Sequence, residues 1–376
     1  MNRSALLVVQ HLLGSGHLRR AVLLGRALAD AGMQVTVASG GMPLAGLNME
    51  GINFVQLPPV RAVDAAFSAL VDADGNVVDA AWRAGRLSAL LTCFDSARPD
   101  LLVLETFPFG RRKMRFELLP LLARAGQAKK KPRIVCSVRD VLQQRKPSRA
   151  AESAEWANRY FDAVWVHGDE KFIPLRDSFP VDQLRIAATH TGYLYDDRGA
   201  AGGEGEGEGE VIVSAGGTGA AGRALNAAAL AAAEADHEKT WRILMGGGAA
   251  HQKWRQHAGR ARVENNRADF PQLLRNCAVS VSRAGCNTVL DLLSARARAV
   301  LVPFEEHGET EQLQRATRLG KTGRAVLLRE HALTPAALTQ AVSKAARAPR
   351  PAKTTVNMNG AATCAALAGE MLRRRG

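Results

Sequence analysis

Short apolar runs alternate with amphipathic stretches along both halves of the chain. Each run has the length and composition of a strand that is buried on both faces of a parallel sheet. The runs occupy residues 5–9, 34–38, 52–57, 100–104, 133–137, 163–167 and 185–189 in the first half, and 211–214, 241–245, a strand ending at 282, and 299–304 in the second.

The stretch between the first two runs shows the helical pattern most clearly. Leu18, Val22 and Leu28 recur at helical spacing, Arg19 and Arg26 fall on the other side, and a glycine follows the last turn. Further helices are expected at residues 78–97, 116–125, 223–235, 313–319 and 358–372. Strands that alternate with helices in this way predict an α/β fold with mostly parallel sheets.

The length of the chain and one low-complexity segment predict two domains. With 376 residues, the chain is long enough for two hydrophobic cores. Residues 205–210 alternate glycine and glutamate, a pattern expected to form a flexible surface segment. We therefore predict a first domain at residues 1–195, a linker at 196–210, a second domain at 211–350 and a C-terminal helix within 351–376.

The charge balance favours anionic partners. The formal net charge is +14, with basic clusters at residues 111–113, 129–131 and 373–375. No nucleic-acid-binding motif accompanies them and aromatic residues make up only 5% of the chain, so no nucleic acid is expected. Five cysteines form no CxxC pair, so no structural zinc is expected either. Neither a signal peptide nor a membrane span is indicated, which favours a cytoplasmic protein.

The turn at Gly14-Ser15-Gly16 places His17 at a helix start, at the edge of the predicted sheet. The turn lacks the GxGxxG spacing of a dinucleotide site, and no acid ends the next strand. A helix N-terminus would lower the pKa of His17 and keep its imidazole neutral and able to act as a base. A purely structural role for this histidine remains the alternative.

Two further strand exits in the first half carry polar side chains. Glu105 follows one strand and precedes Arg111 and Arg112, while Arg139 and Asp140 follow the next. Open α/β sheets bind ligands at this edge. Arg139 and Asp140 either pair with one another or take part in ligand binding.

The second half carries the features of a nucleotide site. The turn at 215–219 follows a strand and precedes a helix, an arrangement that aims backbone amides at a phosphate. A second glycine turn at 283–288 leads into a helix that carries Asp291. The carboxylate of Asp291 can accept hydrogen bonds from the two hydroxyl groups of a ribose. Alone, the second turn is equally compatible with an ordinary structural βα connection.

The second turn and the run 302–312 together resemble the donor-binding half of GT-B glycosyltransferases, which have two facing Rossmann-like domains. The similarity is to the family that contains the peptidoglycan N-acetylglucosaminyltransferase (family 28-like), and residues 283–304 match its spacing without a gap. Two departures are Asp291, where glutamate is usual, and Arg296-Ala297-Arg298 in place of glycine-x-proline. The shorter Asp291 reduces the reach to a ribose.

The first half resembles a bacterial family of predicted glycosyltransferases at residues 105–112, 138–142, 165–169 and 191–193. Together the resemblances imply an active site in the cleft between the domains, and a C-terminal helix that crosses back to the first domain. They imply that His17 is the catalytic base and that acceptor-side residues are Gly14, Ser15, Gly16, Arg19, Glu105, Arg139 and Asp140. The implied donor-binding residues are Gly216, Gly217, Thr218, Gly219, Asn265, Arg283, Gly285, Thr288, Asp291, Glu311 and Gln312.

The implied reaction is transfer of a sugar from a nucleotide sugar, most simply a UDP sugar, to an unidentified acceptor. We expect inversion without a metal, since no aspartate-x-aspartate motif lies in a suitable loop, and no cofactor beyond the nucleotide sugar. The basic surface is compatible with an anionic or lipid-linked acceptor and with peripheral contact at the inner membrane face. A nucleotide-sugar hydrolase or epimerase of the same fold, and a non-catalytic nucleotide-sugar-binding protein, are the alternatives.

Overall fold

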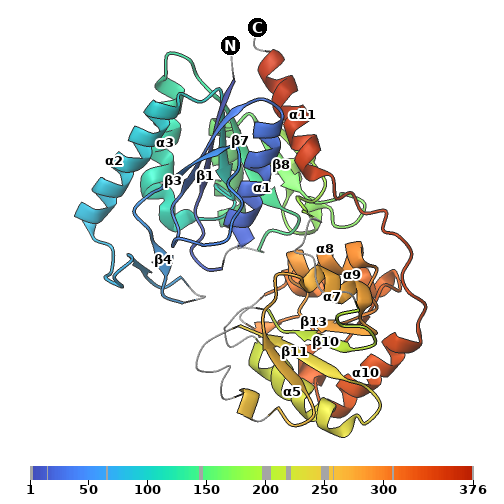
Figure 1. Ribbon diagram of the computed structural model, residues 1–376. Helices are drawn as coiled ribbons and strands as arrows, with labels where there is room; N and C mark the ends of the chain where they lie inside the picture. The colour runs from blue at the N-terminus through green and yellow to red at the C-terminus, as the bar shows by residue number, and fades with distance from the viewer. Residues whose placement is uncertain are drawn as a thin grey trace. The chain divides into compact units, whose positions relative to one another are not determined.

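The protein is described from a computed structural model covering residues 3–14, 16–64, 67–143, 147–196, 205–216, 222–246, 254–256, 258–306 and 309–374. The chain divides into two compact units. The first comprises Met1–Tyr195 and Val356–Gly376, and the second comprises Asp196–Thr355 (Figure 1). Among the helices of the described residues, none combines the length and apolar character that a membrane span needs.

The first unit is built on a seven-stranded parallel sheet with the order β3-β2-β1-β6-β7-β8-β9. Its central strands are buried along almost their whole length, because helices cover both faces, and this explains their continuous apolar runs. The strands are β1 (Ser4–Val9), β2 (Gln34–Ser39), β3 (Ile52–Gln56), β6 (Leu101–Glu105), β7 (Arg133–Arg139), β8 (Ala163–His167) and β9 (Ala187–His190).

Two hydrophobic cores lie in this unit, one on each face of the sheet. The C-terminal helix contributes Cys364, Ala368 and Leu372 to the same core as Leu18 and Leu28 of α1, so the chain ends in the first unit. The helices are α1 (Gly16–Asp30), α2 (Ala80–Ala97), α3 (Arg115–Gln127), α4 (Pro147–Tyr160) and α11 (Gly360–Arg373). Short 3₁₀ turns lie at Arg112–Met114, Leu175–Asp177 and Val181–Gln183.

One helix and one pair of short strands in the first unit were not expected from the sequence. Helix α4 buries only the small residues Ser153, Ala154 and Ala157, so it has no clear stripe of large apolar side chains. The antiparallel pair β4 (Arg61–Ala62) and β5 (Leu70–Val71) is too short to show alternation. Elements are predicted from a helical or an alternating pattern of apolar residues, and neither α4 nor the strand pair has one.

The second unit has a six-stranded parallel sheet with the order β12-β11-β10-β13-β14-β15. Its strands are β10 (Val211–Ser214), β11 (Trp241–Met245), β12 (Arg262–Asn265), β13 (Val279–Ser282), β14 (Ala299–Leu301) and β15 (Ala325–Leu327). Its helices are α5 (Arg223–Ala235), α7 (Phe270–Asn276), α8 (Cys286–Ala295), α9 (Glu311–Lys321) and α10 (Pro335–Arg347), with a 3₁₀ turn at Glu330–Ala332.

The described part of the glycine-glutamate segment, residues 205–210, is held against the second unit by ion pairs and a hydrogen bond. Glu206 and Glu210 both form ion pairs with Arg242, whose side chain is 2% exposed. The backbone carbonyl of Glu206 also accepts a hydrogen bond from Asn276 Nδ2 at 2.9 Å. The glycines take positive φ angles, so the chain can turn at every second residue and present its carboxylates to a buried guanidinium.

A buried ion pair holds the strand exits of the first unit in place. Arg86 of α2 and Glu117 of α3 are both fully buried, with Nε and Oε2 2.9 Å apart. Arg86 also donates to the carbonyl oxygen of Gly40 at 3.2 Å, and Gln10 donates to Glu117 at 2.6 Å. A Cβ at Gly40 would lie 2.0 Å from Arg86 and Gln10, so only glycine fits there. The network joins two helices to the ends of β1 and β2.

We predict that Arg86→Met destabilises the protein by roughly 3–5 kcal/mol, because it leaves the Glu117 carboxylate buried without its partner. The double variant Arg86→Met/Glu117→Leu should recover most of that loss, since it removes both charges. Urea denaturation of the three proteins measures the difference. A single variant within about 1 kcal/mol of the wild type would contradict this role of the pair.

Candidate active site

The turn after β1 delivers a histidine to the first turn of α1. Gly14 has a φ of +67°, a conformation that favours glycine, and α1 begins at Gly16, one residue before His17. Ser15 lies outside the described residues. The neighbouring strand β6 is parallel to β1, with Val8 paired with Leu104, so Glu105 ends β6 at the same edge of the sheet. Residues that are far apart in the sequence therefore meet at one point.

His17 and Glu105 form a close pair. Nδ1 of His17 lies 2.8 Å from Oε1 and 2.9 Å from Oε2 of Glu105. Arg20, one helical turn after His17, donates to the same carboxylate, and the Thr106 hydroxyl donates to its Oε2 at 2.8 Å. The Glu105 side chain is 4% exposed and that of His17 is 15% exposed. The carboxylate is thus held by three neighbours, while the imidazole keeps some access to solvent.

The surroundings keep the imidazole neutral and the carboxylate ionised. Burial lowers the pKa of His17 to about 4, and the positive charges of Arg111 and Arg20 lower it too, although Glu105 raises it. Burial alone would raise the pKa of Glu105, but His17 and Arg20 hold that pKa well below its usual range. At neutral pH the pair is therefore an uncharged imidazole beside a carboxylate.

This geometry assigns the tautomer of His17. A carboxylate only accepts hydrogen bonds, so the neutral imidazole bonded to it must carry its proton on Nδ1. Nε2 is left with a lone pair and can accept a proton from a substrate hydroxyl. A carboxylate in this position orients the ring and stabilises the imidazolium that forms when the proton is taken up.

The other acceptor-side candidates of the first unit are placed differently. Asp140 is fully buried, and its two oxygens accept from Tyr193 Oη at 2.8 Å and from the Val141 amide at 2.9 Å. It therefore shapes the exit of β7, which ends at Arg139. Arg139 is half-buried and Arg19 is exposed.

In the second unit, Arg283 joins the exits of two strands. Its guanidinium, directly after β13, donates to the carbonyl oxygens of Val302 at 3.1 Å and Pro303 at 3.3 Å, just after β14. It also pairs with Glu330 at 2.5 Å and lies over the ring of Phe304. Arg283 is 4% exposed, so its place in the site is to shape the turns around it.

The start of α9 is fixed to the same turns. Oε1 of Gln312 accepts hydrogen bonds from the backbone amides of Ala284 at 3.2 Å and Phe304 at 3.1 Å. Glu311 is buried, with a carboxylate oxygen 3.5 Å from Arg315 one turn later. The Nε2 amide group of Gln312 makes no hydrogen bond among the described residues, so it can donate to a ligand.

Helix α8 begins between these turns. Its N-cap residue is Gly285, and no side chain within the described ranges caps its first amides. Thr288 and Asp291 follow within the helix and are both half-buried. Asn265 is exposed at the end of β12, and Gly216 follows β10 with a φ of +79°. Gly217, Thr218 and Gly219 lie outside the described residues.

The departure at Arg296 keeps the turn that glycine would make. Arg296 caps the end of α8 with φ 54° and ψ 35°, the left-handed conformation that favours glycine, and its amide bonds to the Leu292 carbonyl oxygen. Its Nε donates to the carbonyl oxygen of Pro351 at 2.9 Å. This hydrogen bond offsets part of the backbone strain of a non-glycine residue.

Groups of three or more His, Cys, Asp or Glu side chains that could hold a metal ion are absent from the described part of the chain.

Sequence comparison finds a similarity to a known family in the C-terminal part of the chain. The model of the family described as glycosyltransferase family 28 C-terminal domain matches residues 211–368. A curated relative from Thermotoga neapolitana, UDP-N-acetylglucosamine--N-acetylmuramyl-(pentapeptide) pyrophosphoryl-undecaprenol N-acetylglucosamine transferase, is 31% identical over 70 residues. That match covers 19% of this chain and 21% of the relative, so the chain aligns with about a fifth of the relative's length.

Structure comparison covers the whole chain. The calicheamicin glycosyltransferase CalG4 has a TM-score of 0.64 and 18% identity, covering 99% of this chain and 98% of the other. MurG of Acinetobacter baumannii has a TM-score of 0.59 and 15% identity, covering 99% of each chain. The fold is that of the GT-B glycosyltransferases, an α/β class with two parallel-sheet domains. Within this fold, residues 211–368 match the family 28 C-terminal domain.

Sequence reasoning did not single out Arg20 and Thr106. Both contact the Glu105 carboxylate, and Arg20 lies three residues after His17, on the same face of α1. The position of Arg20, one helical turn after His17, could have indicated that the two side chains lie together. For Thr106 the signal was weaker, because a residue next to an acid bonds to it only in particular backbone conformations, here a φ of 68°.

We predict that His17 titrates far below pH 6.5, near pH 4, because burial and two cations oppose its protonation. Arg111→Gln should raise this pKa by removing a positive charge, and Glu105→Gln should lower it by removing a negative one. The measurement is an NMR pH titration of the His17 ring signals. Titration near pH 6.5 in the wild type would show that the imidazole is not held neutral by its surroundings.

Proposed function

We propose that the protein transfers a sugar from a nucleotide-sugar donor to a hydroxyl of an acceptor, with His17 as the general base. The observation that carries this proposal is the pair of His17 and Glu105, joined at 2.8 Å. A neutral imidazole of lowered pKa remains unprotonated at neutral pH, and its carboxylate partner stabilises the charge that appears when it accepts a proton.

The proposed reaction is a single displacement. Nε2 of His17 takes the proton of the acceptor hydroxyl while that oxygen attacks the anomeric carbon of the sugar. The bond from the anomeric carbon to the diphosphate oxygen breaks, and the nucleoside diphosphate leaves with the electron pair. Attack opposite the leaving group inverts the anomeric configuration. His17 then returns its proton to solvent.

The second unit supplies the proposed donor site. Asp291 accepts hydrogen bonds from the ribose hydroxyls, and the start of α8 together with the turn at Gly216–Gly219 stabilises the diphosphate with backbone amides. Such amides take the place of a metal ion in this proposal. The Nε2 amide group of Gln312, together with Glu311, binds the sugar hydroxyls or a phosphate. The support is that Arg283 and Gln312 already fix the two turns that border α8.

The name of a curated relative and the net charge of the chain indicate which donor and which acceptor to propose. The donor is a UDP sugar, since the Thermotoga neapolitana relative is named for UDP-N-acetylglucosamine. The acceptor is anionic or lipid-linked, because the net charge of +14 attracts anions and the same relative is named for a pyrophosphoryl-undecaprenol substrate. Peripheral contact with the inner face of the membrane accords with such an acceptor.

The test begins with a thermal-shift screen of UDP, GDP, dTDP and their common sugar conjugates. We predict that UDP and one UDP sugar raise the melting temperature, and that Asp291→Ala removes most of this shift. His17→Ala should keep the shift but reduce the release of free nucleotide from the sugar conjugate by at least about 100-fold, as expected for loss of a general base. Water serves as the acceptor where the natural one is unknown.

Two results would contradict the proposal. Unchanged turnover in His17→Ala would remove the assignment of the base while leaving the donor site intact. An absence of any shift with all the nucleotides in the folded wild type would contradict a nucleotide-sugar donor altogether. His190→Ala is a matched control, because it removes a half-buried imidazole of the same unit that lies next to Leu175 and away from Glu105.

A further inference from the structure

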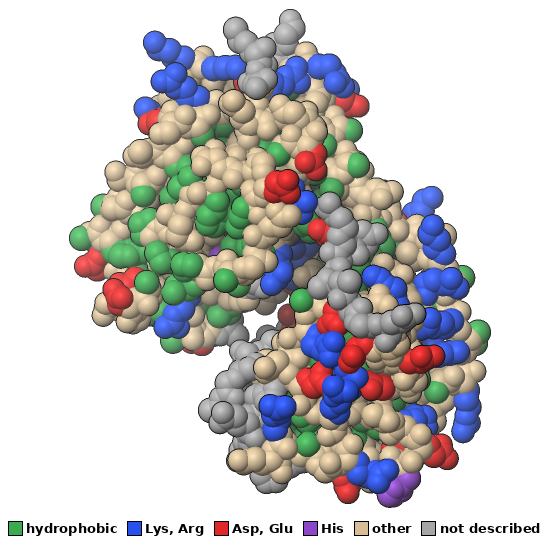
Figure 2. Space-filling model, in the orientation of Figure 1, with side chains coloured by type: hydrophobic (Ala, Val, Ile, Leu, Met, Phe, Trp, Pro, Cys, Tyr) green, Lys and Arg blue, Asp and Glu red, His purple; other side chains and the backbone are tan. Residues whose placement is uncertain are grey.

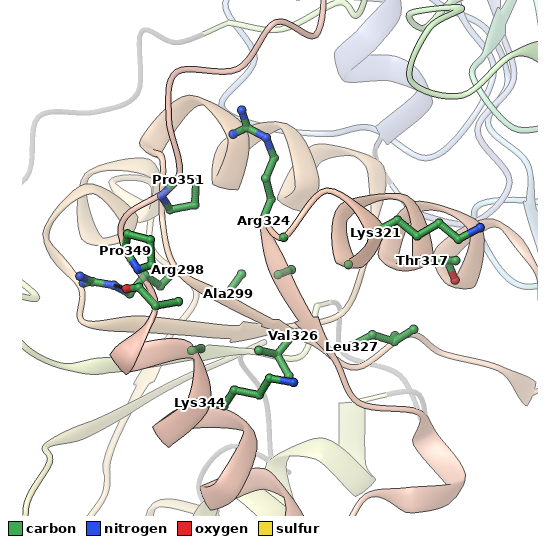
Figure 3. A pocket seen from close by; sticks show the side chains of 15 residues that line it. Arg298, Ala299, Thr317, Lys321, Arg324, Val326, Leu327, Lys344, Pro349 and Pro351 are labelled. Atoms are coloured by element: carbon green, nitrogen blue, oxygen red, sulfur yellow. Dashed lines mark hydrogen bonds between the residues drawn. The ribbon is translucent and has the colours of Figure 1, made fainter.

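A pocket of about 540 Å³ lies along β15, the edge strand of the sheet in the second unit (Figure 3). Its walls come from the ends of α9 and α10, from the amino end of β14 and from the segment after α10. None of the proposed donor-binding residues lines it. That site lies at the carboxyl ends of the strands, whereas this pocket begins at their amino ends, at Arg298 and Arg324.

Four cations surround the pocket. Arg298, Lys321, Arg324 and Lys344 line it, and no acidic residue does. Figure 3 shows their side chains on different sides of the pocket, with the small apolar side chains of Ala299, Val326 and the two prolines between them. Within the described ranges, none of the four forms an ion pair.

The four cations of this pocket differ from several other arginines of the second unit, which have carboxylate partners. Arg242, Arg267, Arg283 and Arg329 of the same unit all pair with carboxylates. Like charges that share a recess repel one another, and a carboxylate among them would relieve that repulsion. No carboxylate of the described residues lines the pocket, so its positive charge favours the binding of an anionic ligand.

The two arginines are fixed in the wall by the backbone. Arg298 Nε donates to the carbonyl oxygen of Ala348 at 2.7 Å. Arg324 donates to the carbonyl oxygens of Ala352 at 2.9 Å and Lys353 at 3.2 Å. Hydrogen bonds to neutral carbonyls leave the positive charge in place. The guanidinium groups are therefore positioned before any ligand arrives, which lowers the cost of binding one.

The two lysines are free to move onto a ligand. Lys321 ends α9 and Lys344 lies in the last turn of α10, and both are exposed. A helix C-terminus favours a cation, which explains why lysines are tolerated at these ends. Neither ammonium group has a partner among the described residues. As exposed side chains without partners in the described part of the chain, they can turn toward an anion in the pocket.

The surrounding segment extends the positive field. Residues 317–353 contain a single acidic residue, Glu330, against eight basic ones: Arg318, Lys321, Arg324, Arg329, Lys344, Arg347, Arg350 and Lys353. Figure 2 shows blue side chains gathered along the side of the second unit that carries α10 and the segment after it. A field of one sign around a recess raises the local concentration of anions.

We propose that this pocket binds the phosphate groups of a phosphorylated organic ligand, at a site separate from the donor site. The cations bind the phosphate oxygens, and the apolar wall between them accepts the organic part of the ligand. With a volume of about 540 Å³, the pocket is large enough for a small molecule. The proposal does not depend on the reaction proposed above.

The test uses inorganic pyrophosphate as the probe and isothermal titration calorimetry at constant ionic strength. Lys321→Ala/Lys344→Ala is the test variant, since both residues are exposed and their removal leaves the arginine-backbone bonds intact. We expect it to weaken pyrophosphate binding by about 10-fold or more, because two charge-assisted contacts are lost. Lys129→Ala/Lys131→Ala removes the same charge from exposed positions of the first unit and should bind as the wild type does.

The donor site would also attract pyrophosphate, so UDP is titrated in parallel. The proposal requires that the pocket variant loses affinity for pyrophosphate and keeps its affinity for UDP. Equal pyrophosphate affinity in the wild type and both variants would overturn it. If none of the three proteins binds UDP, the proposed function is contradicted. The comparison of their pyrophosphate affinities still tests whether the pocket binds phosphate.

Vesicles distinguish the source of the phosphate. Cosedimentation with phosphatidylglycerol vesicles, with phosphatidylcholine vesicles as the reference, is measured for the same three proteins. Loss of phosphatidylglycerol binding in the pocket variant alone identifies a lipid headgroup as the ligand. Equal vesicle binding in both variants, together with weakened pyrophosphate binding in the pocket variant, identifies a free phosphorylated molecule.

Discussion

The hydrogen bond between His17 and Glu105 is the interaction on which the proposed chemistry of this protein depends. It fixes the proton on Nδ1, leaves Nε2 as a base, and places a negative charge where the imidazolium needs it. The bond exists because β1 and β6 are parallel neighbours in register, so that the turn after β1 brings His17 to the carboxyl end of β6, where Glu105 lies. Arg20 and Thr106 then hold the carboxylate from two other directions.

Buried polar contacts secure strand exits in both units. In the first, Arg86 and Glu117 join two helices to the loops that follow β1 and β2. In the second, Arg283 and Gln312 join the turns after β13 and β14 to the start of α9. A parallel sheet leaves the amides and carbonyls of its terminal turns without strand partners, so buried side chains must satisfy them. The same hydrogen bonds hold the turns in place, and with them the site residues at this edge of each sheet.

Much of the fold could be predicted from the sequence, because strands buried on both faces appear as continuous apolar runs. Helix α4 and the short pair β4 and β5 could not, since small buried side chains and two-residue strands leave no periodic pattern. Glu105 and His17 were identified singly from their positions at strand and helix ends. Their pairing depends on strand order, which no local pattern records. The ion pairs of Glu206 and Glu210 were missed because a glycine-glutamate repeat has a low-complexity composition whether or not it folds.

The catalytic role of the His17–Glu105 pair can be tested by the turnover of Glu105→Gln, measured as release of nucleotide from the donor at neutral pH. Glutamine keeps the shape of the side chain but cannot stabilise an imidazolium, and its amide can select the wrong tautomer of His17. We expect turnover to fall by at least about 100-fold while the affinity for the nucleotide is unchanged. Turnover equal to that of the wild type would contradict the assignment of this pair as the catalytic base.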